Sequence, residues 1–295
     1  MFYVFLFIIG LAAGSFLNVV TLRYKEDEKF SLKTIGGRSH CPRCGKILKW
    51  YELIPVLSFF IQRGRCRNCK AKLSIQYPLV EIITALGFVF IPGYFASNGF
   101  SIFGAAFYGE FWPIVVASII WLAAFLIFIS ISIIDFRLMI IPDGANIALG
   151  FLGILSIIFQ AYVLKLNSPT SFLGYYSRFF PVIDNFWLNH LAAVLAGIIF
   201  FGAIIFFSRG RAMGFGDLKL IAALGVIFSW PDIIIVIALS FIVGSLYSAF
   251  LMLKKRKGMK DFVPFGPFII IASLLVFFFG LQLIELYFKL FGIIY

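Results

Sequence analysis

The sequence predicts an all-α polytopic membrane protein with about eight transmembrane helices and one small polar insert. Three observations predict this fold class. Of the 295 residues, 62% are hydrophobic and only 13% are charged, and the mean hydropathy is +1.04. A soluble domain is nearer half apolar, so this chain has too little polar surface to cover a globule. Long apolar runs recur along it, and a single long polar segment follows the first of them.

Eight runs approach the roughly 20 apolar residues that a membrane crossing needs. The first has no basic residue before Arg23, whereas a cleavable signal peptide starts with a positive region, so it is predicted to be a retained helix. The sixth is short and Pro231-Asp232 follows it, which leaves a re-entrant or tilted segment open. The runs are about 2–22, 78–97, 111–134, 145–164, 187–207, 217–231, 233–253 and 264–288.

The basic residues predict the orientation. Four alternate loops carry 22 of the 25 Lys and Arg residues, at 23–77, 135–143, 208–219 and 254–263. Cytoplasmic loops are enriched in Lys and Arg, so both termini are predicted to lie outside. The net charge of +12 therefore follows membrane topology and contact with anionic lipid, and a nucleic-acid partner is not expected. The predicted parts are a first helix at 1–23, a cytoplasmic insert at 24–77 and a helical bundle at 78–295.

Two cysteine pairs lie in the insert, Cys41 with Cys44 and Cys66 with Cys69. Paired CxxC spacing is typical of metal ligation, and four thiolates suit tetrahedral Zn²⁺. The site is predicted to be structural, because four cysteines leave no open position for a substrate. The alternatives are four free thiols or a redox pair, although no thioredoxin-like pattern surrounds either CxxC. An insert of this size has little core, so the metal would supply much of its folding energy.

Two glutamates stand out in this basic region. Glu52 lies between the cysteine pairs, and Glu81 lies about one turn into the second apolar run. A local ion pair with Arg or Lys is the ordinary interpretation of each. A solvated carboxylate is harder to accommodate at Glu81, because this residue is predicted to lie inside a membrane helix. Glu81 is therefore the more informative of the two glutamates.

Two aspartates end apolar runs on the predicted cytoplasmic side. Asp135 closes the third run, and Asp217 follows Gly214-Phe215-Gly216 before Leu218-Lys219. Acids at the edge of a hydrocarbon span are costly and often functional, although an ion pair or a helix cap is the ordinary role of one such residue. Gly214 and Gly216 allow a close approach of another chain. Asp143, after Pro142 and before a helix, is predicted to be an N-cap.

The aspartates predict general acid–base hydrolysis without a covalent intermediate. Two neighbouring carboxylates share a proton, so one can activate water while the other protonates the scissile carbonyl. The two histidines are His40, beside the cysteines, and His190, in the fifth run. No Ser-His-Asp or Cys-His arrangement is therefore expected. A proton or ion transporter and a non-catalytic scaffold are the alternatives from other classes.

Several ordered motifs resemble the bacterial type IV prepilin peptidases, which are bifunctional leader peptidases and N-methyltransferases of the inner membrane. The resemblance covers nearly the whole chain, and Gly214–Lys219 matches the GxGD motif of intramembrane aspartyl proteases. The other matching segments are Gly14–Val20 with Arg23, the double CxxC insert, Glu52–Pro55, Tyr77–Glu81, Asp135, Ile141–Asp143 and Pro264–Phe268. The outward loop 165–186 is longer than the family's.

The resemblance implies that Asp135 and Asp217 are the catalytic pair, with Gly214, Gly216, Asp143 and Lys219 in support. It implies prepilin or pseudopilin substrates, whose short basic leader is cut before a hydrophobic helix at the cytoplasmic face. It further implies N-methylation of the new N-terminus from S-adenosylmethionine, a task of the N-terminal half in which Glu52 and Glu81 are candidates. A peptidase that has lost methylation remains an alternative within the family.

Overall fold

The computed structural model describes residues 1–25, 36–103, 111–166, 169–181, 183–254, 262–290 and 292, with the backbone alone at 99–103. All its long elements are helices, and within these ranges the only β-pairing is two isolated bridges, His40 with Ile47 and Arg65 with Lys72. The chain divides into two compact units, Met1–Gly93 and Tyr94–Tyr295. The all-α membrane fold predicted from composition is thus confirmed.

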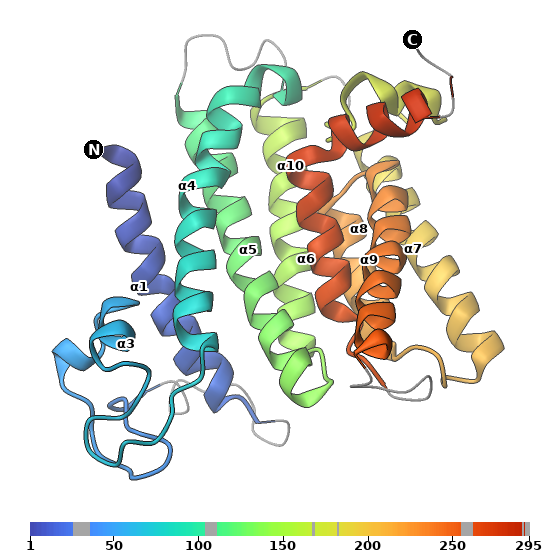
Figure 1. The fold of residues 1–295 in the computed structure, drawn as a ribbon. Coiled ribbons are helices and arrows are strands. Elements are labelled where there is room, and N and C mark those ends of the chain that lie inside the picture. Colours follow the sequence, from blue (N-terminus) through green and yellow to red (C-terminus); the bar gives the residue numbers. More distant parts are fainter. Residues whose placement is uncertain are drawn as a thin grey trace. The chain divides into compact units, whose positions relative to one another are not determined.

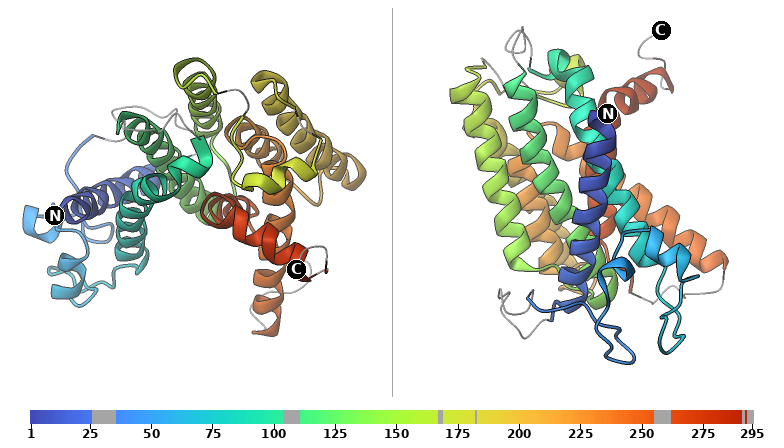
Figure 2. Two further views of the ribbon diagram at one scale, coloured as in Figure 1. Left: turned by 90° about the horizontal axis from the view of Figure 1, so that it is seen from above. Right: turned by 90° about the vertical axis from the view of Figure 1, so that its left-hand side faces the viewer.

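The first unit contains α1 (Phe2–Arg23), the short helices η1 (Trp50–Glu52) and α3 (Leu57–Ile61), and the first part of α4 (Gln76–Phe103). Two small residues four apart on α1 bring it against α4 (Figure 2). A Cβ on Gly10 would lie 2.5 Å from the Cα of Ala85, and one on Gly14 would lie 2.7 Å from the Cα of Glu81. This is the small-xxx-small packing of membrane helices, and here it places Glu81 directly against α1.

The second unit is a helical bundle. Its long helices are α5 (Trp112–Leu138), α6 (Asp143–Ile158, continued as the π-helix η3, Phe159–Val163), α7 (Phe186–Ser208), α9 (Asp232–Leu253) and α10 (Gly266–Leu290). An aromatic cluster fills its interior, where the ring of Trp121 lies 4.3 Å from that of Phe277 and 5.4 Å from that of Phe228, centroid to centroid. The bundle therefore has a packed core of its own.

The sixth predicted span differs from the structure. In the described residues, seven helices are long and apolar enough to cross a membrane, and α8 (Phe215–Ile227) has only 13 residues. At 1.5 Å per residue it is about 20 Å long, short of a bilayer core of about 30 Å. It packs against α6 and α7 (Figure 1), and Leu220, Ile221 and Leu224 are fully buried. Because protein surrounds it, a short helix is tolerated at this position.

The loop between η3 and α7 packs onto the bundle through a short helix, η4 (Gly174–Phe179). Leu173 and Tyr176 are buried there. Asp232, the first residue of α9, accepts hydrogen bonds from the hydroxyl of Ser171 at 2.5 Å and the backbone N–H of Phe172 at 2.9 Å. A buried carboxylate needs such donors, and here they fix the loop to the start of α9.

Candidate functional site

Asp135 lies in the last turn of α5, and its side chain is buried, with 4% exposed. The helix ends at Met139, whose left-handed backbone (φ 57°, ψ 39°) directs its N–H to the carbonyl of Asp135 at 2.8 Å. The carboxylate Oδ2 accepts the backbone N–H of Gly266 at 3.0 Å. The start of α10 therefore supplies a donor to an acid at the end of α5.

Asp217 lies in the first turn of α8 and is also buried. The N–H of Gly214, the residue before the helix, donates to its Oδ2 at 3.3 Å. Its Oδ1 is buried and has no hydrogen-bond partner among the described residues. One oxygen of this carboxylate is therefore held by the backbone, and the other is free to bind a water or a substrate.

The structure brings the two aspartates together around Ile141. A Cβ on Gly216 would lie 3.3 Å from the Cβ of Ile141, and a Cβ on Gly266 would lie 3.1 Å from its Cδ1 and 2.6 Å from the Oδ2 of Asp135. Ile141 therefore lies against the residues that flank both acids. Two neighbouring buried carboxylates resist double ionisation, so a shared proton is the expectation for such a pair.

Asp143 and Lys219 form an ion pair beside this site. The Nζ of Lys219 lies 2.8 Å from the Oδ1 of Asp143, with 52% and 67% of the two side chains exposed. The predicted N-cap role of Asp143 is wrong, because Pro142 occupies that position and Asp143 is the first helical residue, with no side-chain capping bond. Its carboxylate instead links the start of α6 to the first turns of α8.

The four cysteines come together in the insert of the first unit. Two matched turns carry them: the N–H of Cys41 donates to the carbonyl of Lys46, and the N–H of Cys66 donates to that of Ala71, both at 2.9 Å. The four sulfurs lie within 4.8 Å of one another, and Cys41 Sγ to Cys69 Sγ is 3.9 Å. A tetrahedral zinc with Zn–S of 2.3 Å requires about 3.8 Å between sulfurs. The cluster therefore fits zinc.

Thiol ionisation supports the same conclusion. The backbone amide of Lys46 and the side-chain amide of Asn68 lower the pKa of Cys44 to about 6, and the amides of Cys69 and Asn68 lower the pKa of Cys66. Although the amide of Ala71 acts the other way, burial and the three neighbouring sulfurs raise the pKa of Cys69 to about 11. A bound cation would favour the thiolate form of all four cysteines, as it does in thiolate metal sites.

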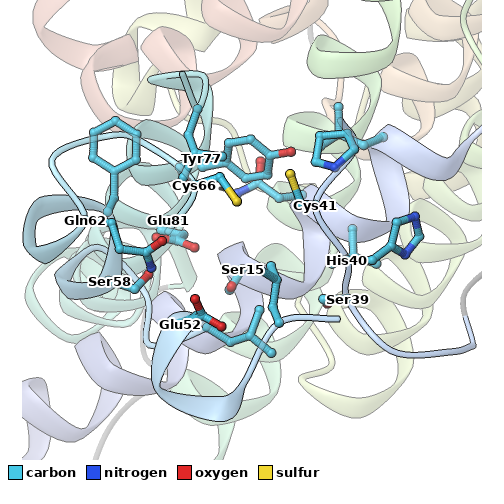
Figure 3. Close-up of a pocket in the computed structure, with 18 of the residues that line it drawn as sticks. Ser15, Ser39, His40, Cys41, Glu52, Ser58, Gln62, Cys66, Tyr77 and Glu81 are labelled. Atoms are coloured by element: carbon cyan, nitrogen blue, oxygen red, sulfur yellow. Dashed lines mark hydrogen bonds between the residues drawn. The ribbon is translucent and has the colours of Figure 1, made fainter. Parts of the chain in front are cut away.

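Glu52 and Glu81 line one cavity of about 280 Å³ in the first unit. Figure 3 shows both carboxylates turned toward the same space, together with Ser15, Tyr77 and two of the cysteines. The backbone N–H of Lys49 donates to Glu52 at 2.9 Å, and that of Val56 donates to Glu81 at 2.6 Å. The side chains are 8% and 7% exposed. Neither forms the expected ion pair with a residue that the structure describes.

Some residues at these sites carry roles that the sequence alone does not reveal. Gly266 belongs to the Pro264–Phe268 motif, and its N–H binds Asp135. Ser15 lines the same cavity as Glu81, and so does Asn18. The Nδ2 of Asn18 donates to the carbonyl of Tyr77 at 3.1 Å. A polar Ser-Phe-Leu-Asn stretch inside an apolar run was the available signal.

Both units of the chain match families of known peptidases. Residues 8–95 match the Bacterial Peptidase A24 N-terminal domain, and residues 120–249 match the Type IV leader peptidase family. Proteins named prepilin leader peptidase/N-methyltransferase are similar to the chain over nearly its whole length. The one from Bacillus subtilis (strain 168) is 31% identical over 97% of each chain. The one from Legionella pneumophila is 28% identical over 97% of this chain and 94% of its own.

A further relative of that name, from Pseudomonas aeruginosa, is 27% identical over 97% of this chain and 93% of its own. No solved structure matches. These relatives extend across the aspartate pair, the four cysteines and the cavity, and they confirm the resemblance drawn from the motifs. The chain is a multi-pass membrane protein that belongs to the type IV leader peptidase family.

Proposed function

We propose that this protein cleaves the basic leader from prepilins or pseudopilins with Asp135 and Asp217 and then N-methylates the new N-terminal residue. The observation that carries the proposal is the meeting of two buried carboxylates from α5 and α8, each held by one backbone N–H. The names of the relatives support both activities. A transporter is less well supported, because the paired acids are held by backbone donors at one end of the bundle rather than strung along it.

The proposed cleavage needs only these two side chains and a water. One carboxylate takes a proton from the water as the oxygen attacks the scissile carbonyl, and the protonated partner donates to the carbonyl oxygen. The tetrahedral intermediate then collapses, and the leaving amine takes a proton. The unpartnered Oδ1 of Asp217 is suited to bind the water. Gly216 lets Ile141 approach the pair closely, and Gly214 keeps the backbone before Asp217 free of a side chain.

The proposed partners and location follow from the same picture. The loops with most Lys and Arg face the cytoplasm of a bacterial inner membrane, and the aspartate pair lies at the ends of helices that adjoin two of those loops. A basic leader followed by a hydrophobic helix would present its cleavage site at this boundary. S-adenosylmethionine supplies the methyl group when bound, and Cys41, Cys44, Cys66 and Cys69 would hold a structural zinc.

The test is cleavage of a peptide with a basic leader and a hydrophobic helix by purified protein in detergent. Wild type, Asp135→Asn and Asp217→Asn are compared, and product masses are recorded. Each substitution should reduce cleavage at least ~1,000-fold, because removing a member of a catalytic unit removes nearly all its effect. Methylation of a peptide supplied already cleaved should stay within twofold of wild type.

Cleavage that survives both substitutions would overturn the aspartate mechanism. Absence of cleavage by wild type, with the helical content intact, would overturn the peptidase assignment. A cleaved product without the added methyl group would restrict the protein to leader cleavage.

A further inference from the structure

The cavity of the first unit has features that leader cleavage does not use. Its volume of about 280 Å³ is near the lower end of small-molecule sites. Apolar side chains such as Val19, Leu22 and Phe59 form part of its wall, and polar groups converge on it from α1, the insert and α4. It is a partly open cavity with mixed polar and apolar walls, of the kind that binds a small organic molecule.

Two carboxylates in this cavity are buried without a cation. Glu52 and Glu81 each accept one backbone N–H, and neither is paired with Lys, Arg or His in the part of the chain that the structure describes. Burying an uncompensated carboxylate is costly. Arg23 also lines the cavity, and its guanidinium donates to the backbone carbonyls of Gly36 and Arg38. A positively charged ligand would offset the cost at the two glutamates.

A third group in the wall is an unused acceptor. Asn18 lines the cavity and is 1% exposed. Its Nδ2 donates to the carbonyl of Tyr77, but its buried Oδ1 has no partner among the residues described. Native structures rarely leave such an atom unsatisfied, so a ligand with N–H or O–H donors is expected there.

The backbone around Glu81 is shaped to hold it. Val56 has φ 60° and ψ −54°, and the N–H of Leu57 donates to the carbonyl of Pro55 at 2.6 Å, which together form a γ-turn. Such a turn is strained at a β-branched residue. The N–H of this same Val56 donates to Glu81. Strain of this kind is concentrated at ligand and active sites.

Resting on the methylation assigned above, we propose that this cavity is the methyl-transfer site, where Glu81 receives the proton of the substrate amine and Glu52 faces the sulfonium cation of the donor. Glu81 and Ser15 lie on helices apolar enough to cross a membrane, and the amine arrives on a hydrophobic helix. Glu52 lies in the polar insert, and the donor arrives from water. Two cationic reactants thus meet two carboxylates that come from different elements, η1 and α4.

The step balances with these groups. A free α-amine has a pKa of about 7.7–8.0 and is mostly protonated at neutral pH. Its proton passes to the carboxylate of Glu81, and the nitrogen lone pair attacks the methyl carbon. The carbon–sulfur bond breaks, its electron pair stays on sulfur, and the donor leaves as a neutral thioether. Glu81 then releases the proton it accepted to water, and the methylated amine remains as an ammonium ion.

The test compares wild type with Glu81→Gln, Glu81→Asp and Glu52→Gln in the full-length protein. Methylation of a pre-cleaved peptide, leader cleavage and equilibrium binding of S-adenosylmethionine are measured on each. At pH 7, Glu81→Gln should methylate at least ~100-fold more slowly, as expected for loss of a general base, with cleavage and donor binding within twofold of wild type. Glu81→Asp should recover at least tenfold of that loss. Glu52→Gln should weaken donor binding at least ~10-fold.

A pH profile separates a proton acceptor from a structural residue. Between pH 7 and pH 9 the amine loses its own proton, so the rate of Glu81→Gln should rise about tenfold relative to wild type. The other titratable side chains of the cavity, Arg23, His40, Cys41, Cys66 and Tyr77, are the same in both proteins. Glu285→Gln, which removes a carboxylate paired with Lys289 on α10, is the matched control and should change nothing.

The outcomes are distinct. If Glu81→Gln methylates at the wild-type rate at pH 7, the role of Glu81 is overturned. The same holds if its methylation rate stays below that of wild type by a factor that does not change with pH. Unchanged donor binding in Glu52→Gln overturns the role of Glu52. In both cases the proposed function stands if wild type cleaves and methylates. A wild type that cleaves and never methylates overturns the methylation half of that function and this inference together.

Discussion

The two carboxylate pairs of this protein are held by the same kind of bond and by different frameworks. Asp135, Asp217, Glu52 and Glu81 each accept one backbone N–H, at 3.0, 3.3, 2.9 and 2.6 Å. For the aspartates the donors lie at the beginnings of α10 and α8, in a bundle with its own aromatic core. For the glutamates they lie in short turns of an insert that has little regular structure.

The aspartate pair and the glutamate cavity therefore owe their rigidity to different interactions. Helix packing buries enough apolar surface to order the ends of α5, α8 and α10. The insert buries little, and a cation held between its four sulfurs would fix the geometry of the two cysteine turns. The aspartate pair should therefore be insensitive to metal, and the glutamate cavity should depend on it.

Metal removal is the largest expected effect and would break the comparison if it failed. Structural zinc contributes on the order of 10 kcal/mol to folding in small domains. Chelation, or Cys41→Ser, should therefore disorder the insert and reduce methylation at least ~100-fold. Cleavage should fall less than about tenfold. Zinc content, both activities and limited proteolysis within 36–75 are measured on the same samples.

Equal loss of both activities would contradict this separation. It would show that the insert also positions the scissile bond. Cys44→Ser is the second variant for this test, because Cys44 is exposed and its replacement disturbs packing least.

Gly266→Ala is the next effect in size and acts on the other framework. The added Cβ would lie 2.6 Å from Asp135 Oδ2 and 3.1 Å from Ile141 Cδ1. The first contact is too short to persist, so the carboxylate or the start of α10 must shift, and the second requires Ile141 to move by a few tenths of an ångström. A displacement of about 1 Å in a catalytic group can cost on the order of 100-fold, and we expect cleavage to fall by ~10–100-fold while methylation of a cleaved peptide is unchanged.

The matched control for this substitution is Gly150→Ala. Gly150 is also helical, in α6, and a Cβ there meets nothing within 4 Å, so cleavage should stay within twofold of wild type. Full cleavage by Gly266→Ala would show that the N–H of Gly266 does not define the position of Asp135.

The sequence predicts some of these features well, for physical reasons that differ. Hydrophobic runs locate the long helices, because a bilayer sets the length of a span. The two CxxC pairs identify the four-cysteine cluster, because each pair is local in the chain and each turn brings its own sulfurs together.

Contacts between distant residues were not predictable in this way. Gly266 and Asp135 are 131 residues apart, and their bond depends on how α10 and α5 pack. Asp143 was assigned to a local cap, but Lys219, 76 residues away, takes its carboxylate. The 217–231 run was counted as a span because composition does not show that neighbouring helices enclose α8. The left-handed Val56, which sets the donor to Glu81, has no sequence signature, since β-branched residues avoid that conformation.

Breaking the ion pair of Lys219 with Asp143 should give the smallest effect on cleavage. It shows how little a surface contact beside the aspartate pair contributes, compared with the buried contacts that hold the acids. Both side chains are more than half exposed, and exposed pairs contribute about 0–1 kcal/mol. In a double-mutant cycle of Lys219→Met and Asp143→Asn, we expect a coupling energy of about 0.5 kcal/mol and cleavage within threefold of wild type. Single-turnover cleavage at low and high salt provides the measurement, because screening removes a surface pair first. A coupling above about 2 kcal/mol would mean that substrate binding buries the pair, and the catalytic machinery of the bundle would then extend from Asp135 and Asp217 to the start of α6.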